Sequence, residues 1–502
     1  MNPSSRLLTS LSEASIMSPD RTQPSLPRRI HLVGVGGAGL SGAARLLLQR
    51  GHAVSGFDRC DSPFLVGLRE QGMDLQLGED GRRPLDPEVG LVVRSAAVPD
   101  DDPDVAAALE RGTPVWKYAR LVGALCPSER TLAVAGTHGK TTVSWLLAYA
   151  LRGLEHAEGG ASTRRGFLVG GACQKLGVNA TLPEAGGWFA VEACEYDRSF
   201  HQLPARGAIV TNVESDHLDY YGDLESIEIA FARFCDGVDP GGLIVVGREV
   251  PERVHSEARA PVWRLGREVD VRLLGEDRGR FCMRVDGPGW ATPPIQLDLP
   301  GSFQVDNAAL AVALTVGLAA RDLGIEPAAA AAVVGRELMR FSGAVRRFER
   351  WGTLGEVEVV HDYAHHPTEV QVTLDAARRA FPGVPIHVLF QPHQESRTAR
   401  FMDEFTESLR GIDRVVVSDV YGARRHIDAM GAGASDLAAR LRAAGVDATA
   451  GGDLASSLQT TLDELPPRCA LLVLGAGDVD TLRDDLLHDL ALRRAAPSGA
   501  RR

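Results

Sequence analysis

The 502-residue chain contains very little lysine: among its 54 Lys and Arg residues, only Lys117, Lys140 and Lys175 are lysines. Acidic residues outnumber basic ones, and the formal net charge of -12 argues against nucleic acid as a partner. The seven cysteines include no Cys-x-x-Cys pair, which is typical of reduced thiols in the cytoplasm. No uninterrupted apolar run reaches the roughly 18 residues of a membrane span. These absences predict a cytoplasmic enzyme with no membrane partner.

Strands and helices alternate along the chain in three blocks, which predicts an α/β fold with three domains. The blocks are 29–126, 127–343 and 344–495. Residues 1–28 are rich in Ser, Pro and Arg without an apolar signal core, so we expect a disordered leader. A disordered tail is expected at 496–502. We expect a monomer or a weak homodimer.

The second block opens with an apolar strand that runs into a glycine-rich turn and a helix. The turn consists of Gly136, Thr137, His138, Gly139, Lys140, Thr141 and Thr142. Glycines let backbone N–H groups curl around a phosphate, Lys140 neutralises it, and the Thr141 hydroxyl can ligate Mg²⁺. Val134 stands where the standard phosphate loop has its first glycine, so a ligand-free strand-turn-helix is the alternative. Because the chain uses Arg for nearly every other cation, the lysine at position 140 indicates that a compact point charge is needed there, which favours phosphate binding.

The first block opens similarly, with a short strand at 29–33, a glycine-rich turn and a helix. The turn carries Gly34, Gly36, Gly37 and Gly39, and an acidic residue, Asp58, ends the next strand about 20 positions on. This pattern predicts a diphosphate ligand without identifying it. Because NAD is the commonest ligand of such a turn, an NAD-dependent oxidoreductase is one alternative.

Polar residues follow several predicted strands, at the edge where parallel sheets bind ligands. In the second block they are Glu192, the last residue of the strand 188–192, and His217, which follows the strand 208–212. In the third block they are Asp362, His365 and His366 after 356–360, and His393 and Arg397 after 386–390. Glu192 and His217 can reach a metal beside Lys140, although each also fits an ordinary solvated loop residue.

Taken together, these segments resemble the Mur ligases, and most of all the branch that adds L-alanine to UDP-N-acetylmuramate in peptidoglycan precursor synthesis. The resemblance runs from about 29 to 490. It rests on the segments 136–142, 211–212 with Asp216, His217 and Asp219, 346–349, 362–369 and 390–393. It implies a Rossmann-like UDP-binding domain, a central P-loop ATPase domain with a mostly parallel sheet, and a small doubly wound C-terminal domain.

The resemblance also implies roles for individual residues, with ATP, Mg²⁺, UDP-N-acetylmuramate and L-alanine as ligands. The glycines Gly34, Gly36, Gly37 and Gly39, with Ser95, would bind the UDP-sugar. Lys140 would bind the β- and γ-phosphates, Thr141 one Mg²⁺, and Glu192 with His217 a second Mg²⁺. Asn307 would contact adenine, Arg347 a phosphate and Asp362 the ribose. His365 and Arg397 would hold L-alanine, and the domains would close about hinges near 126 and 343.

Five residues at three places depart from the family pattern: Gln394 and Glu395, Phe303 and Gln304, and His361. Glu395 would repel an amino-acid carboxylate unless its side chain faces away. A second alternative therefore stays open within the family, a recycling ligase that attaches a tripeptide to UDP-N-acetylmuramate.

Overall fold

The computed structural model describes residues 25–155, 163–173, 175–422 and 433–495. Most of the expected leader and all of the expected tail lie outside these residues. The chain divides into two compact units, one ending at Glu129 with the short segment Gln202–Pro204 added, and one containing the rest. The domain boundaries near 126 and 343 stay predictions.

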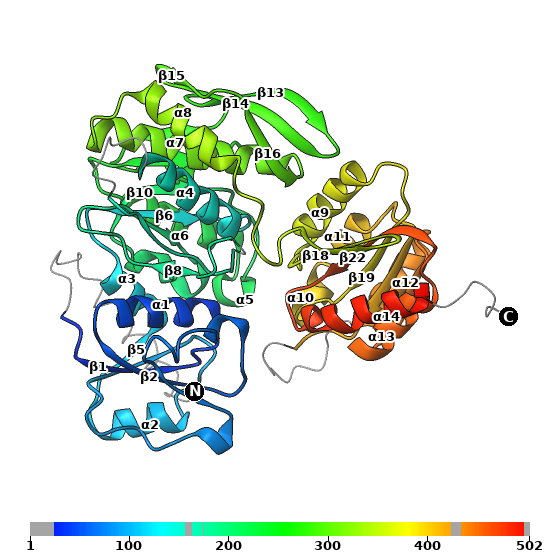
Figure 1. The fold of residues 1–502 in the computed structure, drawn as a ribbon, viewed down its shortest axis with the longest axis horizontal. Coiled ribbons are helices and arrows are strands. Elements are labelled where there is room, and N and C mark those ends of the chain that lie inside the picture. Colours follow the sequence, from blue (N-terminus) through cyan, green and yellow to red (C-terminus); the bar gives the residue numbers. More distant parts are fainter. Residues whose placement is uncertain (1–24, 156–162, 174, 423–432, 496–502) are drawn as a thin grey trace, which may run out of the picture. The chain divides into compact units, whose positions relative to one another are not determined.

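The first unit is built on a five-stranded parallel sheet in the order β3-β2-β1-β4-β5. Its strands are β1 Arg29–Val33, β2 Ala53–Asp58, β3 Asp74–Leu77, β4 Leu91–Arg94 and β5 Val115–Lys117. Its helices are α1 Ala38–Gln49, α2 Pro103–Glu110 and α3 Tyr118–Leu125. Helices α1 and α3 cover one face and α2 the other (Figure 1). Both faces of β1 are therefore covered, and four of its five residues, including His31, are buried.

The second unit begins with a seven-stranded sheet in the order β12-β11-β10-β6-β9-β7-β8, parallel except for the pair β7–β8. Its strands are β6 Thr131–Ala135, β7 Gly166–Leu168, β8 Ala180–Thr181, β9 Phe189–Glu192, β10 Ala205–Val210, β11 Leu243–Val246 and β12 Val262–Arg264. Its helices are α4 Lys140–Glu155, α5 Leu218–Tyr221, α6 Leu224–Asp236, α7 Phe303–Asp322 and α8 Pro327–Leu338. Strand β6 is central and wholly buried, so the loop that follows it starts from a rigid element.

The region 245–300 contributes to both the sheets and the core of the second unit. Its first part supplies β12 to the parallel sheet, and the rest forms an antiparallel sheet. The strands of this sheet are β13 Asp270–Asp277, β14 Arg280–Gly287, β15 Trp290–Ala291 and β16 Ile295–Pro300. Buried side chains of β14 and β16 join α4, α7 and α8 in one apolar core. Alternation of apolar and polar residues in β14 and β16 gives each strand one core face.

Helix α7 is long and apolar enough in composition to cross a membrane, which the search for an uninterrupted apolar run did not detect. Asp306 and Asn307 interrupt the run near its first turn. Most of the apolar stretch, 83%, is buried inside the fold, and α7 packs against α4 and α8. The helix is apolar nearly all round because protein surrounds it.

The last part of the second unit is a six-stranded sheet in the order β17-β18-β22-β19-β20-β21, with β17 antiparallel at one edge. Its strands are β17 Glu349–Leu354, β18 Glu356–Asp362, β19 Ile386–Phe390, β20 Arg414–Ser418, β21 Ala448–Gly452 and β22 Arg468–Leu474. Its helices are α9 Pro367–Ala380, α10 Glu395–Arg400, α11 Met402–Ser408, α12 Ala434–Ala443, α13 Leu454–Asp463 and α14 Arg483–Ala495. Separate apolar cores lie on the two faces, as a doubly wound fold requires.

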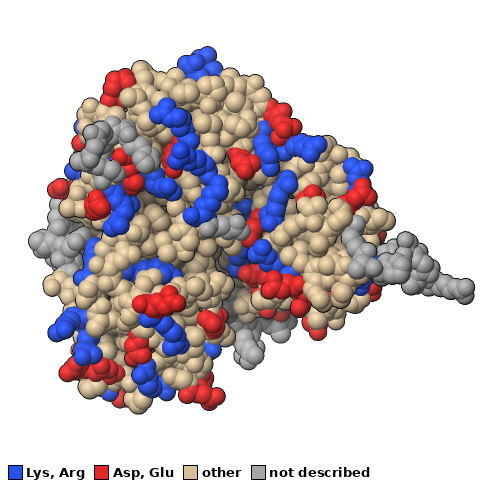
Figure 2. All heavy atoms as spheres, in the orientation of Figure 1, with Lys and Arg blue, Asp and Glu red and all other residues tan. Residues whose placement is uncertain are grey.

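On the face shown in Figure 2, basic and acidic side chains are interspersed over the described residues. Many of the arginines are paired with carboxylates, including Arg82 with Asp102 and Asp104, and Arg206 with Asp239 and Asp322. The arginine-rich composition thus supplies ion pairs between elements of each unit.

Candidate nucleotide and acyl-transfer site

The loop after β6 has a backbone conformation that favours glycine at two positions. At Gly136 the φ angle is 145°, and a Cβ atom there would lie 1.8 Å from the Thr211 Oγ1 atom. Gly139 has φ 81° and turns the chain into α4, whose first residue is Lys140. The His138 amide donates to the Asn212 Oδ1 atom at 2.8 Å, which fixes the loop against the end of β10. The loop therefore places the N-terminus of α4 at the carboxyl edge of the sheet.

Lys140 lies within this loop and is paired with a carboxylate that the sequence analysis missed. Its Nζ atom donates to the carbonyl oxygens of Gly136 and Thr137 at 2.7 and 2.9 Å, and to Glu195 Oε1 at 3.0 Å. Burial disfavours the charged amine, but attraction to the Glu195 carboxylate raises the pKa of Lys140 above its ordinary value. Glu195 is 3% exposed. Glu195 follows Glu192 by three residues, beyond the same strand, and this position in the sequence could have identified it as a site residue.

The three predicted magnesium ligands lie around Lys140. Thr141 Oγ1 donates to Glu192 Oε1 at 3.0 Å, and the other oxygen of Glu192 accepts from the Gly170 amide at 2.8 Å. His217 lies near Glu195, the partner of Lys140, with its Nε2 atom 3.7 Å from Glu195 Oε1. The structure thus brings Thr141 and Glu192 into contact and joins His217 to the same cluster through Glu195.

A cavity of about 130 Å³ lies beside the loop. Its lining includes Gly139, Thr142, Asn307, Arg347 and Asp362, which are all predicted nucleotide-binding residues. Asn307, which is predicted to contact adenine, donates to Gln304 Oε1 at 3.1 Å. Gln304, which departs from the family pattern, therefore orients Asn307. Phe303 and Phe348 supply apolar surface to the same cavity. A cavity with a few polar groups among apolar ones suits a nucleoside.

Asp362 is oriented by the backbone around it. Its two oxygens accept from the amides of Phe348 and Ala364 at 2.7 and 2.8 Å. Burial raises the pKa of Asp362 to about 6, although the nearby Arg347 guanidinium opposes this shift. Arg347 itself lies 3.6 Å from Glu369 and over the ring of Tyr363. Its charge is thus held at the cavity by a carboxylate and an aromatic face.

The predicted amino-acid site also forms a cluster. Arg397 is 8% exposed and donates from Nη2 to Asp216 Oδ1 at 2.6 Å, while its Nη1 lies 3.3 Å from His393 Nδ1. Although burial opposes ionisation of Asp216, the guanidinium holds the pKa of this carboxyl well below its usual range. The rings of His365 and His393 are 5.6 Å apart. Glu395 is exposed at the start of α10, whereas Arg397 is buried.

The glycine loop of the first unit lies at the carboxyl end of β1, where the strand order reverses between β1 and β4. The Gly36 amide donates to Asp58 Oδ2 at 2.7 Å. Gly34 approaches Ser95, because a Cβ atom on Gly34 would lie 2.9 Å from Ser95 Oγ. Gly39 packs under Tyr118, whose ring would be 2.7 Å from an added Cβ. Gly37 caps α1 from an extended backbone.

The two units and their sites define a nucleotide-binding α/β enzyme in which a phosphate loop and an ion-pair cluster share one edge of a parallel sheet. Family models match three consecutive stretches of the chain. They are described as Mur ligase family, catalytic domain, at 29–130, Mur ligase middle domain at 134–315, and Mur ligase, glutamate ligase domain at 346–477.

Known proteins resemble the chain over nearly its whole length. A UDP-N-acetylmuramate–L-alanine ligase from Kineococcus radiotolerans is 40% identical over 479 residues, which are 93% of this chain and 97% of the relative. The solved UDP-N-acetylmuramate–alanine ligase of Thermotoga maritima has a TM-score of 0.74 at 24% identity, covering 93% and 100% of the two chains. A murein peptide ligase from Psychrobacter arcticus has a TM-score of 0.66 at 22% identity, covering 93% and 99%.

The chain belongs to the Mur ligase family and is an ATP-using ligase. The predicted fold class is confirmed, with a Rossmann-like sheet, a central mostly parallel sheet and a doubly wound C-terminal sheet.

Proposed function

We propose that this chain joins L-alanine to UDP-N-acetylmuramate at the expense of ATP. The observation that carries the proposal is the 40% identity to a relative of that name over almost the full length of both proteins. The geometry supports it, because a cationic glycine-rich loop, a partly apolar cavity and a guanidinium cluster lie in one unit.

The first step is activation of the substrate carboxylate. A carboxylate oxygen of the muramoyl group attacks the γ-phosphorus of ATP, the bond to the β-phosphate oxygen breaks, and ADP leaves from an acyl phosphate. Such a transfer needs positioning and charge neutralisation. In our proposal Lys140 leaves Glu195 and binds the β- and γ-phosphates, while Asn307, Arg347 and Asp362 hold the nucleoside and its phosphates.

Magnesium fits the residues present around Lys140. Thr141 and Glu192 place two oxygen donors in contact, and His217 contributes a nitrogen from the neighbouring loop. Mg²⁺ prefers oxygen ligands and keeps several waters and substrate phosphates in nucleotide sites, so two or three protein ligands suffice. Bound there, the ion would supply electrostatic stabilisation of the transferring phosphoryl group.

The second step joins the amino acid. The amine of L-alanine attacks the acyl carbon, and phosphate leaves after a tetrahedral intermediate. Arg397 uses Nη2 for Asp216 and retains further N–H donors that can hold the alanine carboxylate. His365, whose Nδ1 lies 3.0 Å from the Tyr363 carbonyl oxygen, borders the same cluster. Glu395 is exposed to solvent, which screens its repulsion of the alanine carboxylate.

Two alternative functions are a recycling ligase and an oxidoreductase. The recycling ligase has the same fold, but the likeness to the murein peptide ligase at 22% identity concerns the fold alone. The oxidoreductase alternative rests on the first glycine loop and leaves Lys140, Glu192 and His217 without a role. Both are less well supported than alanine ligation.

The test measures phosphate release from ATP in the presence of Mg²⁺ and UDP-N-acetylmuramate. L-alanine, glycine, L-serine and the tripeptide are added one at a time, and the product is identified by mass spectrometry. We expect release to be fastest with L-alanine. Release with the tripeptide alone would assign the recycling function, and no release with any acceptor would contradict both.

A further inference from the structure

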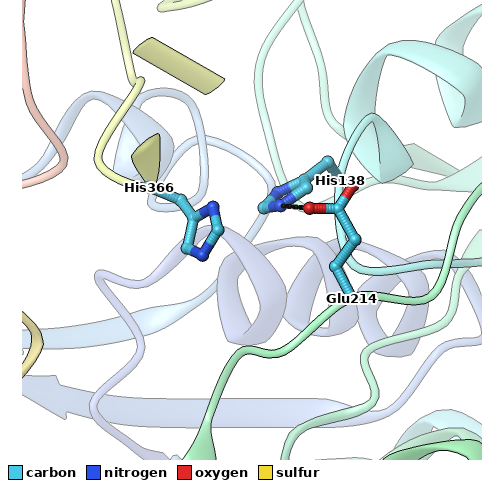
Figure 3. Close-up of side chains that lie close together, drawn as sticks. All are labelled: His138, Glu214 and His366. Carbon is cyan, nitrogen blue, oxygen red and sulfur yellow. Dashed lines mark ion pairs between the residues drawn. The ribbon is translucent and has the colours of Figure 1, made fainter. Parts of the chain in front are cut away.

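Two histidines and a glutamate from three separate segments converge at one point in the second unit (Figure 3). His138 comes from the phosphate loop, Glu214 from the loop after β10, and His366 from the residue that caps α9. One potential ligand atom of each lies within 4.8 Å of the other two. The two imidazole rings are 4.8 Å apart, between centroids.

His138 is oriented as a metal-binding histidine is. Its Nδ1 atom lies 3.3 Å from Glu369 Oε1, so the carboxylate holds a ring proton at Nδ1. Its Nε2 atom is buried and lies 3.6 Å from Glu214 Oε2. Although burial opposes this shift, Glu214 and Glu369 raise the pKa of His138 to about 9, so a metal ion would replace the Nε2 proton. A histidine that ligates a metal almost always donates its other N–H to a carboxylate or carbonyl in this way.

The other two side chains are also held in place by contacts on their far sides. The Thr368 amide donates to the lone pair of His366 Nδ1 at 3.4 Å, so a metal ion at that nitrogen would replace this long hydrogen bond. In Figure 3 one ring nitrogen of His366 faces His138. His366 is 5% exposed, and Glu214 Oε2 accepts from the Thr368 hydroxyl at 2.9 Å. The same threonine therefore positions both residues from behind.

We propose that His138, Glu214 and His366 form a binding site for a divalent transition-metal ion of the Zn²⁺ class. Two imidazole nitrogens and one carboxylate oxygen are a donor set of zinc sites that keep a fourth position for water. Zinc bonds of about 2.0–2.2 Å require the donor atoms to draw closer, which small side-chain rotations provide. The Glu369 carboxylate behind His138 also pairs with Arg347 at 3.6 Å and His365 at 3.1 Å, so Glu214 supplies the negative charge at the site.

This site differs chemically from the magnesium cluster around Lys140. Two of its three donors are nitrogens, which suit Zn²⁺, whereas Mg²⁺ prefers oxygen. An ion there would tie the phosphate loop to the segment 365–369, because His138 follows β6 and His366 follows β18, and these strands belong to different sheets of the unit. The inference is independent of the amino acid that the enzyme uses.

The experiment titrates the metal-free full-length protein with Co²⁺, followed by its visible absorption spectrum, and then adds Zn²⁺. We expect one Co²⁺ per chain with the bands of a nitrogen and oxygen site, no thiolate-to-cobalt band, and displacement by Zn²⁺. Glu214→Gln and His366→Asn should each weaken Co²⁺ binding at least tenfold. Asparagine keeps a helix-capping side chain at 366.

His387→Asn is the matched control, because His387 is a half-buried histidine on β19 outside the cluster. It should bind Co²⁺ as the unaltered protein does. Circular dichroism establishes that each variant is folded. Unchanged Co²⁺ affinity in both cluster variants, a thiolate band from the exposed Cys60 or Cys194, or no saturable binding would each overturn the proposal.

Discussion

The two glycine-rich loops of this protein follow the same sequence pattern but use opposite charges. Both follow a buried parallel strand and lead into a helix. In the first, the Gly36 amide is bound by the Asp58 carboxylate. In the second, Lys140 occupies the loop and bonds to two of its carbonyl oxygens. In the first loop one amide is thus already bound by a carboxylate, whereas the second loop carries a cation that is suited to holding a phosphoryl group.

The glycines of the two loops also serve different contacts. Gly136 has a φ angle of 145° and lies against Thr211, so its lack of a side chain is required by the backbone itself. Gly39 lies within α1 and makes room for the ring of Tyr118. The pattern of glycines therefore does not by itself reveal which of them approach a ligand.

The largest expected effect comes from removing the cation. In Lys140→Ala we expect kcat to fall about a thousandfold, because the transferring phosphate loses its main charged donor. The affinity for UDP-N-acetylmuramate should stay within about twofold, because the first loop is unchanged. Phosphate release measures the former and calorimetric titration the latter.

Lys175→Ala is the matched control, since Lys175 is an exposed lysine of the same unit that bonds to the Arg340 carbonyl. It should retain full activity. Loss of UDP-sugar binding together with retained ATP hydrolysis in Lys140→Ala would reverse the roles of the two loops.

The second comparison adds one methyl group to each loop. Gly136→Ala should lower the stability of its unit by about 3 kcal/mol, from backbone strain and a clash with Thr211. Gly39→Ala should cost about 1 kcal/mol, because alanine's better helix propensity offsets part of the clash with Tyr118. Calorimetric unfolding measures both, with Gly275→Ala as a control that meets no atom within 4 Å. Equal losses would show that the two loops are equally constrained.

Removing the loop's counter-ion should have a smaller effect. In Glu195→Gln the buried ion pair with Lys140 is lost, so we expect a stability decrease of about 2 kcal/mol. The KM for ATP should fall severalfold, because Lys140 no longer has to leave a carboxylate. Steady-state kinetics and thermal unfolding measure the two changes. A higher KM would mean that Glu195 positions Lys140 for the nucleotide.

Much of the fold was predictable because parallel strands buried on both faces give unbroken apolar runs. The strands 29–33, 386–390 and 414–418 were predicted with the bounds that they have in the structure. The part that region 245–300 plays in the core was not predicted, because its alternating strands bury one face against helices that come both earlier and later in the sequence. Sequence spacing does not show such long-range packing.

The site was predictable where chemistry follows directly from a strand end. Glu192 and His217 were named for that reason. Thr141 was named from the glycine-rich turn and Asn307, Arg347 and Asp362 from the family resemblance, whereas Glu195 and Glu214 were not named. Glu195 acquires its importance from contact with Lys140, 55 positions away. Glu214 acquires it from contacts with Thr368 and His138, which belong to distant segments. Partners of this kind become visible only when the loops are folded together.

The smallest expected effect tests the first loop. Asp58→Asn removes a negative charge beside the Gly36 amide and keeps an oxygen that can accept hydrogen bonds. Since that charge repels a diphosphate, we expect UDP-N-acetylmuramate to bind about threefold more tightly at low salt, with the gain lost at high salt. Calorimetric titration at two ionic strengths measures it, and kcat should not change. Weaker binding would instead mean that Asp58 holds the ligand directly. The charged residues of both loops, Asp58 and Lys140, would then bind their ligands.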